Sequence, residues 1–292
     1  MIINKNNTRI NQTGFTLLEV TIVVVIVSIL LGFTVALIPK QQELKRYKEA
    51  DREMDKILDA IVGFAQVYGR LPCPSAAASA GVSAGGGNID CVTFGGFVPS
   101  STLGFNGRLN TDSLLSDPWG NPYRYYVSNS DADGGGADDS DFVINGEMQE
   151  VGLVDVVDVP SADLSGDDRI DLDGQFLICD SAGSSTNDLC TGAIRVFGNP
   201  DLVNGPPYAY EGAIAVLLSH GKSGDGAGVT GADHLENRGT TLTNGYYLKN
   251  VAGSETTFVR RTTGLADDFD DIVKWISPSA LFSKMIEADQ LP

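Results

Sequence analysis

The longest apolar run of the chain lies near its N-terminus. The 24 residues from Phe15 to Ile38 contain one charged residue, Glu19. At 1.5 Å per residue, a helix of this length reaches roughly 36 Å, enough to cross a hydrocarbon core of about 30 Å. We therefore expect residues 15–38 to span a membrane. A carboxylate inside such a segment costs about 2.5–3.5 kcal/mol on insertion scales, so Glu19 is a candidate functional residue that needs a partner.

A second helical pattern follows at residues 41–68. Apolar residues recur there at spacings of three and four, which places them on one face, and charges of both signs fill the other face. The expected buried face consists of Leu44, Tyr47, Met54, Ile57, Ile61, Phe64, Ala65 and Tyr68. Pro39 lacks a backbone donor, so we expect it to bend or interrupt the helix. Gly69 and Pro72 mark its end.

The rest of the chain reads as short strands separated by turns. The strand candidates are rich in β-branched and aromatic residues, with turn-forming residues between them. They lie at residues 123–127, 152–159, 175–180, 193–197, 213–218, 246–251 and 257–262. Ser277 and Pro278 then begin a short helix that reaches about Asp289. The predicted fold class is α+β: a long N-terminal helix, residues 15–69, packed on a β-rich head, residues 70–292.

Composition narrows the possible functions. The net charge of the 292 residues is −18 at neutral pH, and the sequence does not indicate a basic face. Both observations argue against nucleic-acid binding. The four cysteines of the chain, in an exported domain, indicate two disulfides. Cys73 and Cys91 flank a loop rich in Gly, Ala and Ser, and Cys179 and Cys190 flank a polar loop. We expect each of these pairs to be bonded.

The segment from Gly14 to Glu19, GFTLLE, follows a short polar and basic leader and opens the apolar run. It resembles the type IV prepilin signal, and the resemblance covers about residues 1–69. In that family a prepilin peptidase cuts after the Gly and methylates the new N-terminus. The Glu at mature position five pairs with a neighbouring subunit's N-terminal amine during filament assembly. The resemblance implies a leader at residues 1–14, cleavage before a methylated Phe15, and an assembly role for Glu19.

Other interpretations of this N-terminus fit less well. An ordinary secretory signal peptide has a shorter apolar run and an A-x-A cleavage site, which is missing here. A plain signal anchor would leave Glu19 without a role. Positive charge does not settle the orientation, because Lys and Arg occur on both sides of the apolar run. The cysteines and the acidic C-terminal bulk favour an exported head.

A second resemblance covers residues 70–127. A subgroup of pilin-like proteins carries RLPCP after the helix, then a G-FVPxxTLG-type segment and a D-x-WGNPxRY block, which here runs from Asp117 to Tyr125. The core of this block also looks like the turn after the helix in the major pseudopilins of type II secretion. Physically it is a Pro/Gly/Asn turn with an aromatic residue, Trp119. We expect Trp119 to anchor the core, with an exposed ligand-binding role as the alternative.

Acidic residues gather between residues 128 and 174. Positions 1, 3, 5 and 9 of an EF-hand-like loop are held by Asp163, Ser165, Asp167 and Asp171. The loop's Gly position holds Asp168 and its bidentate Glu position holds Gly174, so a complete EF-hand is not expected. Because many carboxylates repel one another unless they are neutralised, a looser Ca²⁺ site is one interpretation. A solvated acidic loop is the other.

Residues 219–228, SHGKSGDGAG, are not a P-loop, because Val216 stands at the first required Gly position. Ser219 and His220 do not indicate a hydrolase, since no G-x-S-x-G elbow is present, and His234 is expected in a loop. The segment resembles the late strand and glycine loop of pseudopilins, and residues 267–275 resemble their closing strand. In that family the two loops approach each other around Ca²⁺. This implies the candidate ligands Asp225, Asp267, Asp268 and Asp270.

The resemblances imply a structural subunit and not an enzyme. The large, loop-rich head favours a minor pilin of a type IV pilus-like filament. The alternatives are a pseudopilin of type II secretion, an adhesin displayed on the filament, and a membrane-anchored enzyme, for which no catalytic constellation exists. The implied partners are prepilin peptidase, other subunits through the N-terminal helix, and the bacterial inner membrane before assembly into a periplasmic or extracellular filament. Calcium is the one cofactor expected.

Overall fold

The computed structural model describes backbone at residues 14, 16–129, 140, 142–150, 194–197, 208–226, 232–249, 251, 256–260 and 269–291. Side chains are not described at residues 32–40, 149–150, 194–197, 208–212, 232–233 and 257. The chain divides into two units, residues 1–46 and residues 47–292. The second unit is the globular head, and each unit is described by itself below.

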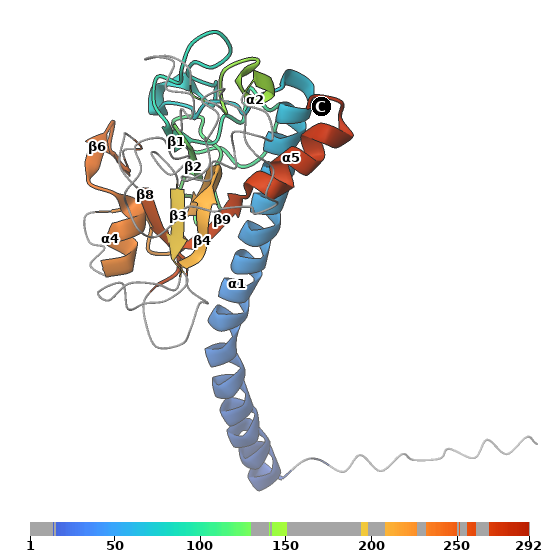
Figure 1. The fold of residues 1–292 in the computed structure, drawn as a ribbon. Coiled ribbons are helices and arrows are strands. Elements are labelled where there is room, and N and C mark those ends of the chain that lie inside the picture. The colour runs from blue at the N-terminus through green and yellow to red at the C-terminus, as the bar shows by residue number, and fades with distance from the viewer. Residues whose placement is uncertain are drawn as a thin grey trace, which may run out of the picture. The chain divides into compact units, whose positions relative to one another are not determined.

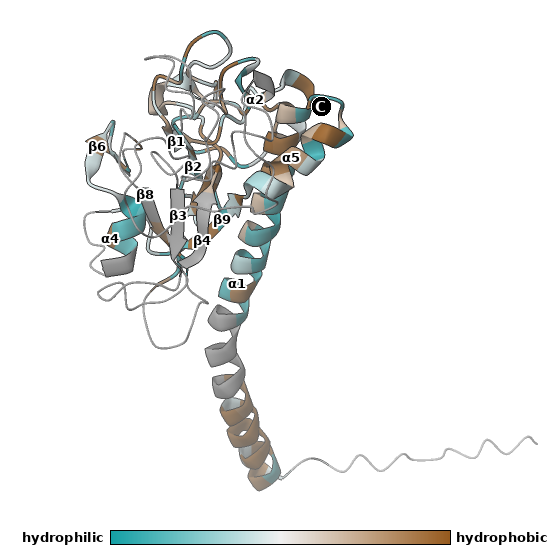
Figure 2. Ribbon diagram, in the orientation of Figure 1, coloured by the Kyte–Doolittle hydropathy of each residue, from teal (hydrophilic) through white to brown (hydrophobic). Residues whose placement is uncertain are grey.

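Helix α1 runs from Leu17 to Tyr68 and is 52 residues long. Its start follows from an N-cap, because the Thr16 hydroxyl oxygen accepts a hydrogen bond from the backbone N–H of Glu19 at 3.3 Å. Its end follows from Gly69, which adopts the left-handed conformation with φ of 69°. The helix continues through Pro39, so the interruption, one of the two outcomes expected there, does not occur. Figure 2 shows its first turns as hydrophobic and later turns as hydrophilic.

The described strands form three sheets. An antiparallel sheet has the order β1 (Gly95–Phe97), β2 (Arg124–Val127), β5 (Ala215–Ser219) and β9 (Ile272–Ile276). A second sheet has the order β4 (Tyr208–Ala213), β3 (Ile194–Phe197) and β8 (Thr256–Val259), in which β3 and β8 are parallel. Strands β6 (Thr241–Thr243) and β7 (Tyr246–Leu248) form a hairpin. The remaining helical elements are η1 (Ala77–Ser79), α2 (Glu147–Glu150), α4 (Ala232–Arg238) and α5 (Pro278–Glu287).

This architecture confirms the predicted α+β fold, a long N-terminal helix followed by antiparallel sheet. Strands overlap the predicted segments 123–127, 193–197, 213–218, 246–251 and 257–262, whereas 152–159 and 175–180 lie outside the described residues. Strand β1 was not predicted, because its sequence Gly-Gly-Phe has little β propensity. It exists through pairing with β2, where a Cβ atom on Gly95 would lie 2.8 Å from the Tyr126 ring.

The second half of α1 supplies one side of the main core. Met54, Ile57, Ile61 and Ala65 are fully buried, as the helical pattern predicts. They belong to one cluster with side chains of β2, β5 and α5, and Figure 1 shows α5 beside the end of α1. Two members of the predicted face are exposed: Tyr68 (57%) is the last helical residue, and Leu44 (62%) precedes the head unit.

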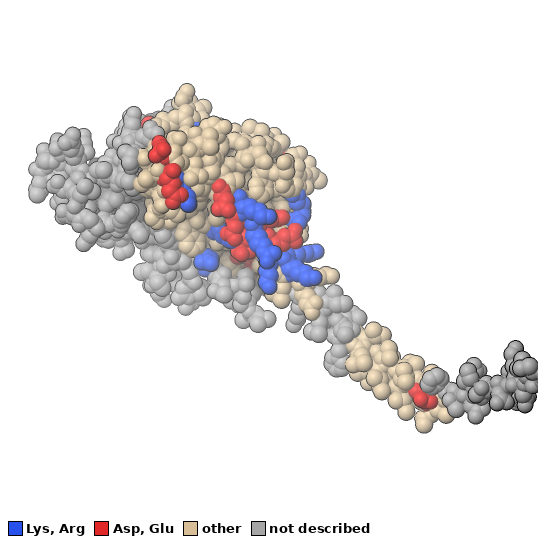
Figure 3. Space-filling view, turned by 90° about the vertical axis from the view of Figure 1, so that its right-hand side faces the viewer, with Lys and Arg blue, Asp and Glu red and all other residues tan. Residues whose placement is uncertain are grey.

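Ion pairs attach the polar side of α1 to the rest of the head. The Lys274 ammonium of β9 lies 2.8 Å from the Asp51 carboxylate and 2.5 Å from that of Asp55. Arg108 lies 2.7 Å from Glu49. The face of the molecule drawn in Figure 3 accordingly carries basic and acidic side chains intermixed, and not a basic patch.

Candidate functional site

The N-terminal signal is partly described. Gly14 is exposed, and no other described part of the chain lies within 4 Å of a Cβ atom placed on it. Phe15 lies outside the described residues. Large apolar side chains between residues 17 and 31 are 45–84% exposed. This stretch of α1 is therefore an exposed apolar surface.

Residues 15–38, expected to span a membrane, are covered only in part, because side chains at 32–40 are not described. Within the described residues, no helix is long and apolar enough to cross a bilayer. The membrane-spanning role of this segment stays a prediction.

The carboxylate of Glu19 is exposed in the first turn of α1. Among the described residues it has no hydrogen bond or ion pair; only its backbone N–H is engaged, by Thr16. A negative charge at this place interacts favourably with the positive end of the helix dipole. The helix start therefore fixes the backbone of Glu19 and leaves its carboxylate exposed.

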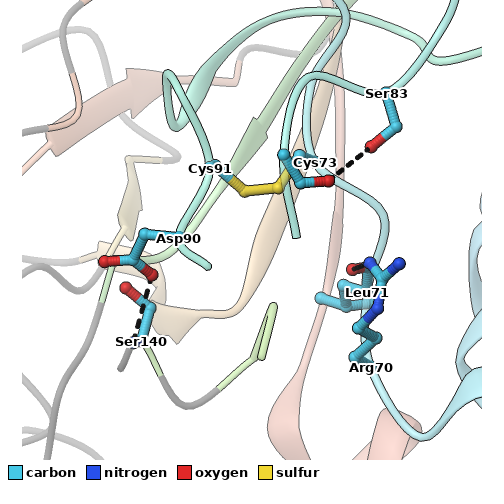
Figure 4. Close-up of a disulfide and its surroundings, with 8 residues drawn as sticks. Arg70, Leu71, Cys73, Ser83, Asp90, Cys91 and Ser140 are labelled. Carbon is cyan, nitrogen blue, oxygen red and sulfur yellow. Dashed lines mark hydrogen bonds between the residues drawn. A yellow bond between two sulfur atoms is a disulfide. The ribbon is translucent and has the colours of Figure 1, made fainter. Parts of the chain in front are cut away.

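A disulfide closes the segment that follows α1. Cys73 and Cys91 are bonded with their Cα atoms 5.4 Å apart, as predicted, and both are buried (Figure 4). The enclosed small-residue segment contains η1 and isolated β-bridges. Gly86 shows why small residues are needed there, because a Cβ atom on it would lie 2.6 Å from the Arg70 guanidinium and 3.1 Å from the Cys73 sulfur. The disulfide and this segment are therefore closely packed next to the residues that follow α1.

The Asp117–Trp119 turn is an anchor. The buried carboxylate of Asp117 accepts hydrogen bonds from the backbone N–H groups of Trp119 and Asn121 at 2.9 Å, and from the Ser219 hydroxyl at 2.7 Å. Burial raises the pKa of Asp117, although these hydrogen bonds oppose the shift. Trp119 is half-buried and packs edge-on against Tyr47 of α1, with ring centres 4.9 Å apart. This arrangement supports the anchoring role and commits Ser219 to Asp117.

Asp225 was expected among the calcium ligands, but it forms an ion pair. Its carboxylate accepts a hydrogen bond from the guanidinium of Arg124, which is fully buried on β2. That guanidinium stacks on the rings of Phe97 and Tyr246, 4.3 Å and 5.0 Å from their centres. Burial lowers the pKa of Arg124, and the negative charge of Asp225 opposes this. A role for Asp225 in calcium binding stays a prediction.

Both histidines of the chain meet at one carboxylate, that of Asp271. Strands β5 and β9 are antiparallel with Ser219 opposite Ile272, so the next pair along the ladder direction is His220 and Asp271. The third participant is His234 of α4, which is therefore helical and buried and not in the loop expected for it. The topology thus brings three distant segments to one point.

The distances within this cluster are short. Asp271 Oδ1 lies 3.1 Å from His234 Nδ1 and 3.4 Å from His220 Nδ1. Its other oxygen accepts a hydrogen bond from the Asn237 amide at 2.9 Å, and Asn237 stands one turn after His234 on the same face of α4. Asp270 Oδ1 lies 3.5 Å from His234 Nε2. The four titratable side chains form one continuous buried network.

The two histidines lower the pKa of Asp271. Burial alone would raise the pKa of Asp271, but the hydrogen bonds and charges of His220 and His234 outweigh it and hold that pKa below its usual value. His234, Asp270 and Asp271 can each present one ligand atom within 4.8 Å of the others, so this group could hold a metal ion. Of these three residues, only Asp270 was predicted from the sequence to be a metal ligand.

Several predicted site residues lie outside the described part of the chain. They are Phe15, Asp163, Ser165, Asp167, Asp171, Cys179, Cys190, Asp267 and Asp268. The Cys179–Cys190 disulfide and the calcium loops they belong to stay predictions.

Comparison with known proteins identifies a family motif at the N-terminus. Residues 9–35 match the family described as the prokaryotic N-terminal methylation motif. No curated protein and no solved structure matches the chain. The motif is the signal of type IV pilins and pseudopilins, and it coincides with the start of α1. The chain therefore carries, at residues 9–35, the N-terminal signal by which prepilin peptidase recognises pilins and pseudopilins.

Proposed function

We propose that the protein is a minor pilin, a structural subunit of a type IV pilus-like filament. Prepilin peptidase cuts between Gly14 and Phe15, and the first half of α1 packs with the same segment of other subunits. One observation carries this proposal. Helix α1 buries Met54, Ile57, Ile61 and Ala65 in its own head, whereas its large apolar side chains from 17 to 31 are exposed. Lipid before assembly, and neighbouring helices after it, would cover that apolar surface.

Glu19 is the residue on which assembly depends in this proposal. A carboxylate surrounded by apolar helices is costly unless it is paired. The amine that cleavage creates at Phe15 carries the opposite charge. An ammonium group from a neighbouring subunit within a few ångströms offsets much of the cost, because the Coulomb attraction is strong at low dielectric. The pair would also fix how far one subunit is displaced along the next.

The size of the head favours a minor pilin, since it extends from residue 70 to residue 292 and contains most of the 34 glycines. The Asp117–Trp119 turn supports a second candidate, a pseudopilin of type II secretion, because its sequence resembles theirs and it anchors the head to Tyr47. The two candidates differ in where the protein is found. A minor pilin co-purifies with filaments sheared from the cell surface, whereas a pseudopilin stays with the cell envelope.

The test compares Glu19→Ala with wild type. Removal of the carboxylate should leave membrane insertion intact or improve it, because a costly charge is gone, and should reduce incorporation into filaments at least tenfold. The matched control is Glu43→Ala on the same helix, whose carboxylate lies 3.8 Å from Arg46 and has no assembly role in this proposal. Quantitative immunoblots of membrane and filament fractions give both readouts. Incorporation of Glu19→Ala at the wild-type level would show that the carboxylate is not an assembly device.

A further inference from the structure

We propose that the buried cluster of His234, Asp270 and Asp271, bordered by His220, binds a divalent transition metal of the Zn²⁺ class. The donor set is the first reason. Ca²⁺ takes six to eight oxygen ligands, whereas imidazole nitrogen combined with carboxylate suits Zn²⁺ and its neighbours. The chain has two histidines, and both face the same carboxylate. This inference does not depend on the N-terminal signal.

The distances are the second reason. In a tetrahedral site, metal–ligand bonds of 2.0–2.2 Å put neighbouring ligand atoms about 3.3–3.6 Å apart. In the cluster, Asp271 Oδ1 is 3.1 Å from His234 Nδ1 and 3.4 Å from His220 Nδ1, and His234 Nε2 is 3.5 Å from Asp270 Oδ1. Two of these three separations exceed the usual hydrogen-bond length for nitrogen and oxygen. The two distances from His234 involve different ring nitrogens, of which one ion can use only one. With one ligand atom taken from each residue, His234, Asp270 and Asp271 present three atoms that lie within 4.8 Å of one another, close enough to surround one small ion.

His234 can give only one ring nitrogen to an ion. Whichever nitrogen it uses, a carboxylate faces the other one, Asp270 at Nε2 or Asp271 at Nδ1. Metal-bound histidines usually donate their second N–H to such a group, which fixes the ring and raises its basicity. The cluster therefore offers both the ligands and the support that a bound imidazole needs.

His220 borders the cluster with one ring nitrogen. The side chain of His220 is 2% exposed, and its Nε2 atom has no hydrogen-bond partner among the described residues. A buried polar atom without a partner costs about 1–3 kcal/mol, so such atoms call for an explanation. Because the other ring nitrogen, Nδ1, faces Asp271, this atom is not counted among the ligand atoms of the cluster.

The carboxylates are held in place by their surroundings. The Asn237 amide donates to Asp271 Oδ2 at 2.9 Å and to the Val259 carbonyl at 2.8 Å. Asp270 accepts hydrogen bonds from both the backbone N–H and the hydroxyl of Ser223, the former at 2.6 Å. Ligand atoms fixed in this way lose little freedom when an ion binds, which is how a site gains affinity through preorganisation. A bound ion would join the end of β5, helix α4 and the start of β9.

The test uses the full-length chain in detergent, freed of metal with a chelator and then titrated separately with Zn²⁺, Ca²⁺ and Mg²⁺. Calorimetry should show one Zn²⁺ per chain bound at least tenfold more tightly than Ca²⁺. At a hundredfold excess over the dissociation constant, Zn²⁺ should raise the melting temperature by about 5–10 °C. Co²⁺ in place of Zn²⁺ should give the visible absorption bands of a four-coordinate nitrogen and oxygen site, a readout that needs no variant.

Two variants assign the ligands. His234→Asn keeps a side-chain N–H near Nδ1 for Asp271 but removes the imidazole, and Asp270→Asn removes a carboxylate. Each should weaken Zn²⁺ binding at least tenfold and abolish the Co²⁺ bands. The control Asp59→Asn removes the same charge from an exposed position of α1 and should bind Zn²⁺ as wild type does.

Three results would overturn the inference. They are the absence of Co²⁺ bands in the wild-type chain, equal Zn²⁺ affinity of wild type and His234→Asn, and tighter binding of Ca²⁺ than of Zn²⁺ at the cluster. If Ca²⁺ stabilises wild type and His234→Asn equally, calcium binds elsewhere, as the acidic residues 163–173 predict. None of these results bears on cleavage at Gly14, so the proposed function would stand or fall separately.

Discussion

The replacement Ile57→Ala tests whether the second half of α1 is the core of the head. Ile57 is fully buried in the main hydrophobic cluster. The change removes three buried carbons, worth about 2.4 kcal/mol at 0.8 kcal/mol each. The cavity left behind raises the expected loss of unfolding free energy to about 3–4 kcal/mol. For a domain of this size, the melting temperature should fall by about 6–16 °C.

The matched control is Leu44→Ala, which removes the same number of carbons from the same helix. Its side chain is 62% exposed, so its loss should change the unfolding free energy by less than about 0.5 kcal/mol. Tryptophan fluorescence of the full-length chain is a suitable assay, because both tryptophans, Trp119 and Trp275, belong to the head unit. If the two variants melt at the same temperature, α1 is not part of the core of the head and the reasoning is refuted.

Three further predictions concern the head. Replacement of Cys73 and Cys91 by Ser should lower stability by about 3 kcal/mol, because the bridge spans a sequence separation of 18 residues; non-reducing peptide maps should recover this pair, and free thiols would contradict it. Asp225→Asn should cost about 3–5 kcal/mol in urea unfolding, because it leaves the buried Arg124 charge unpaired; a loss below about 1 kcal/mol would refute this. Burial and a hydrogen-bonded carboxylate raise the pKa of Tyr246 to about 12, so its contribution to stability is complete below pH 10 and is lost as the pH rises toward 12; Tyr246→Phe should flatten that alkaline decline, measured by melting temperature against pH.

Features that depend on local sequence could be predicted. The start of α1, the buried positions from Met54 to Ala65, strand β2 and the Ser277 cap of α5 all follow from periodicity, capping chemistry and turn residues within a few positions. The Cys73–Cys91 pair could be predicted because a short loop of small residues separates the two cysteines. In each case the interaction that decides the structure lies close along the chain.

Features that depend on distant pairing could not be predicted. His220 and Asp271 become neighbours through the β5–β9 register, and His234 reaches them from a short helix. No spacing rule links these positions. The same holds for Asp225, for which the resemblance to a pseudopilin loop implied calcium binding, and whose ion pair with a buried arginine on another strand no local pattern indicates. The sequence nevertheless contained a clue to the cluster. The chain has two histidines and adjacent aspartates, and such residues can be considered together as members of one site.

The assignment as a processed, pilin-like subunit is tested most directly by mass spectrometry of the N-terminus of the mature protein. The mature chain should begin at Phe15 and carry one methyl group on its N-terminal amine. Gly14→Asp should block cleavage without disturbing the head, because no other described part of the chain lies within 4 Å of a Cβ atom at that position. A mature protein that retains residues 1–14, or one cut beyond Ile38, would contradict the assignment as a pilin-like subunit.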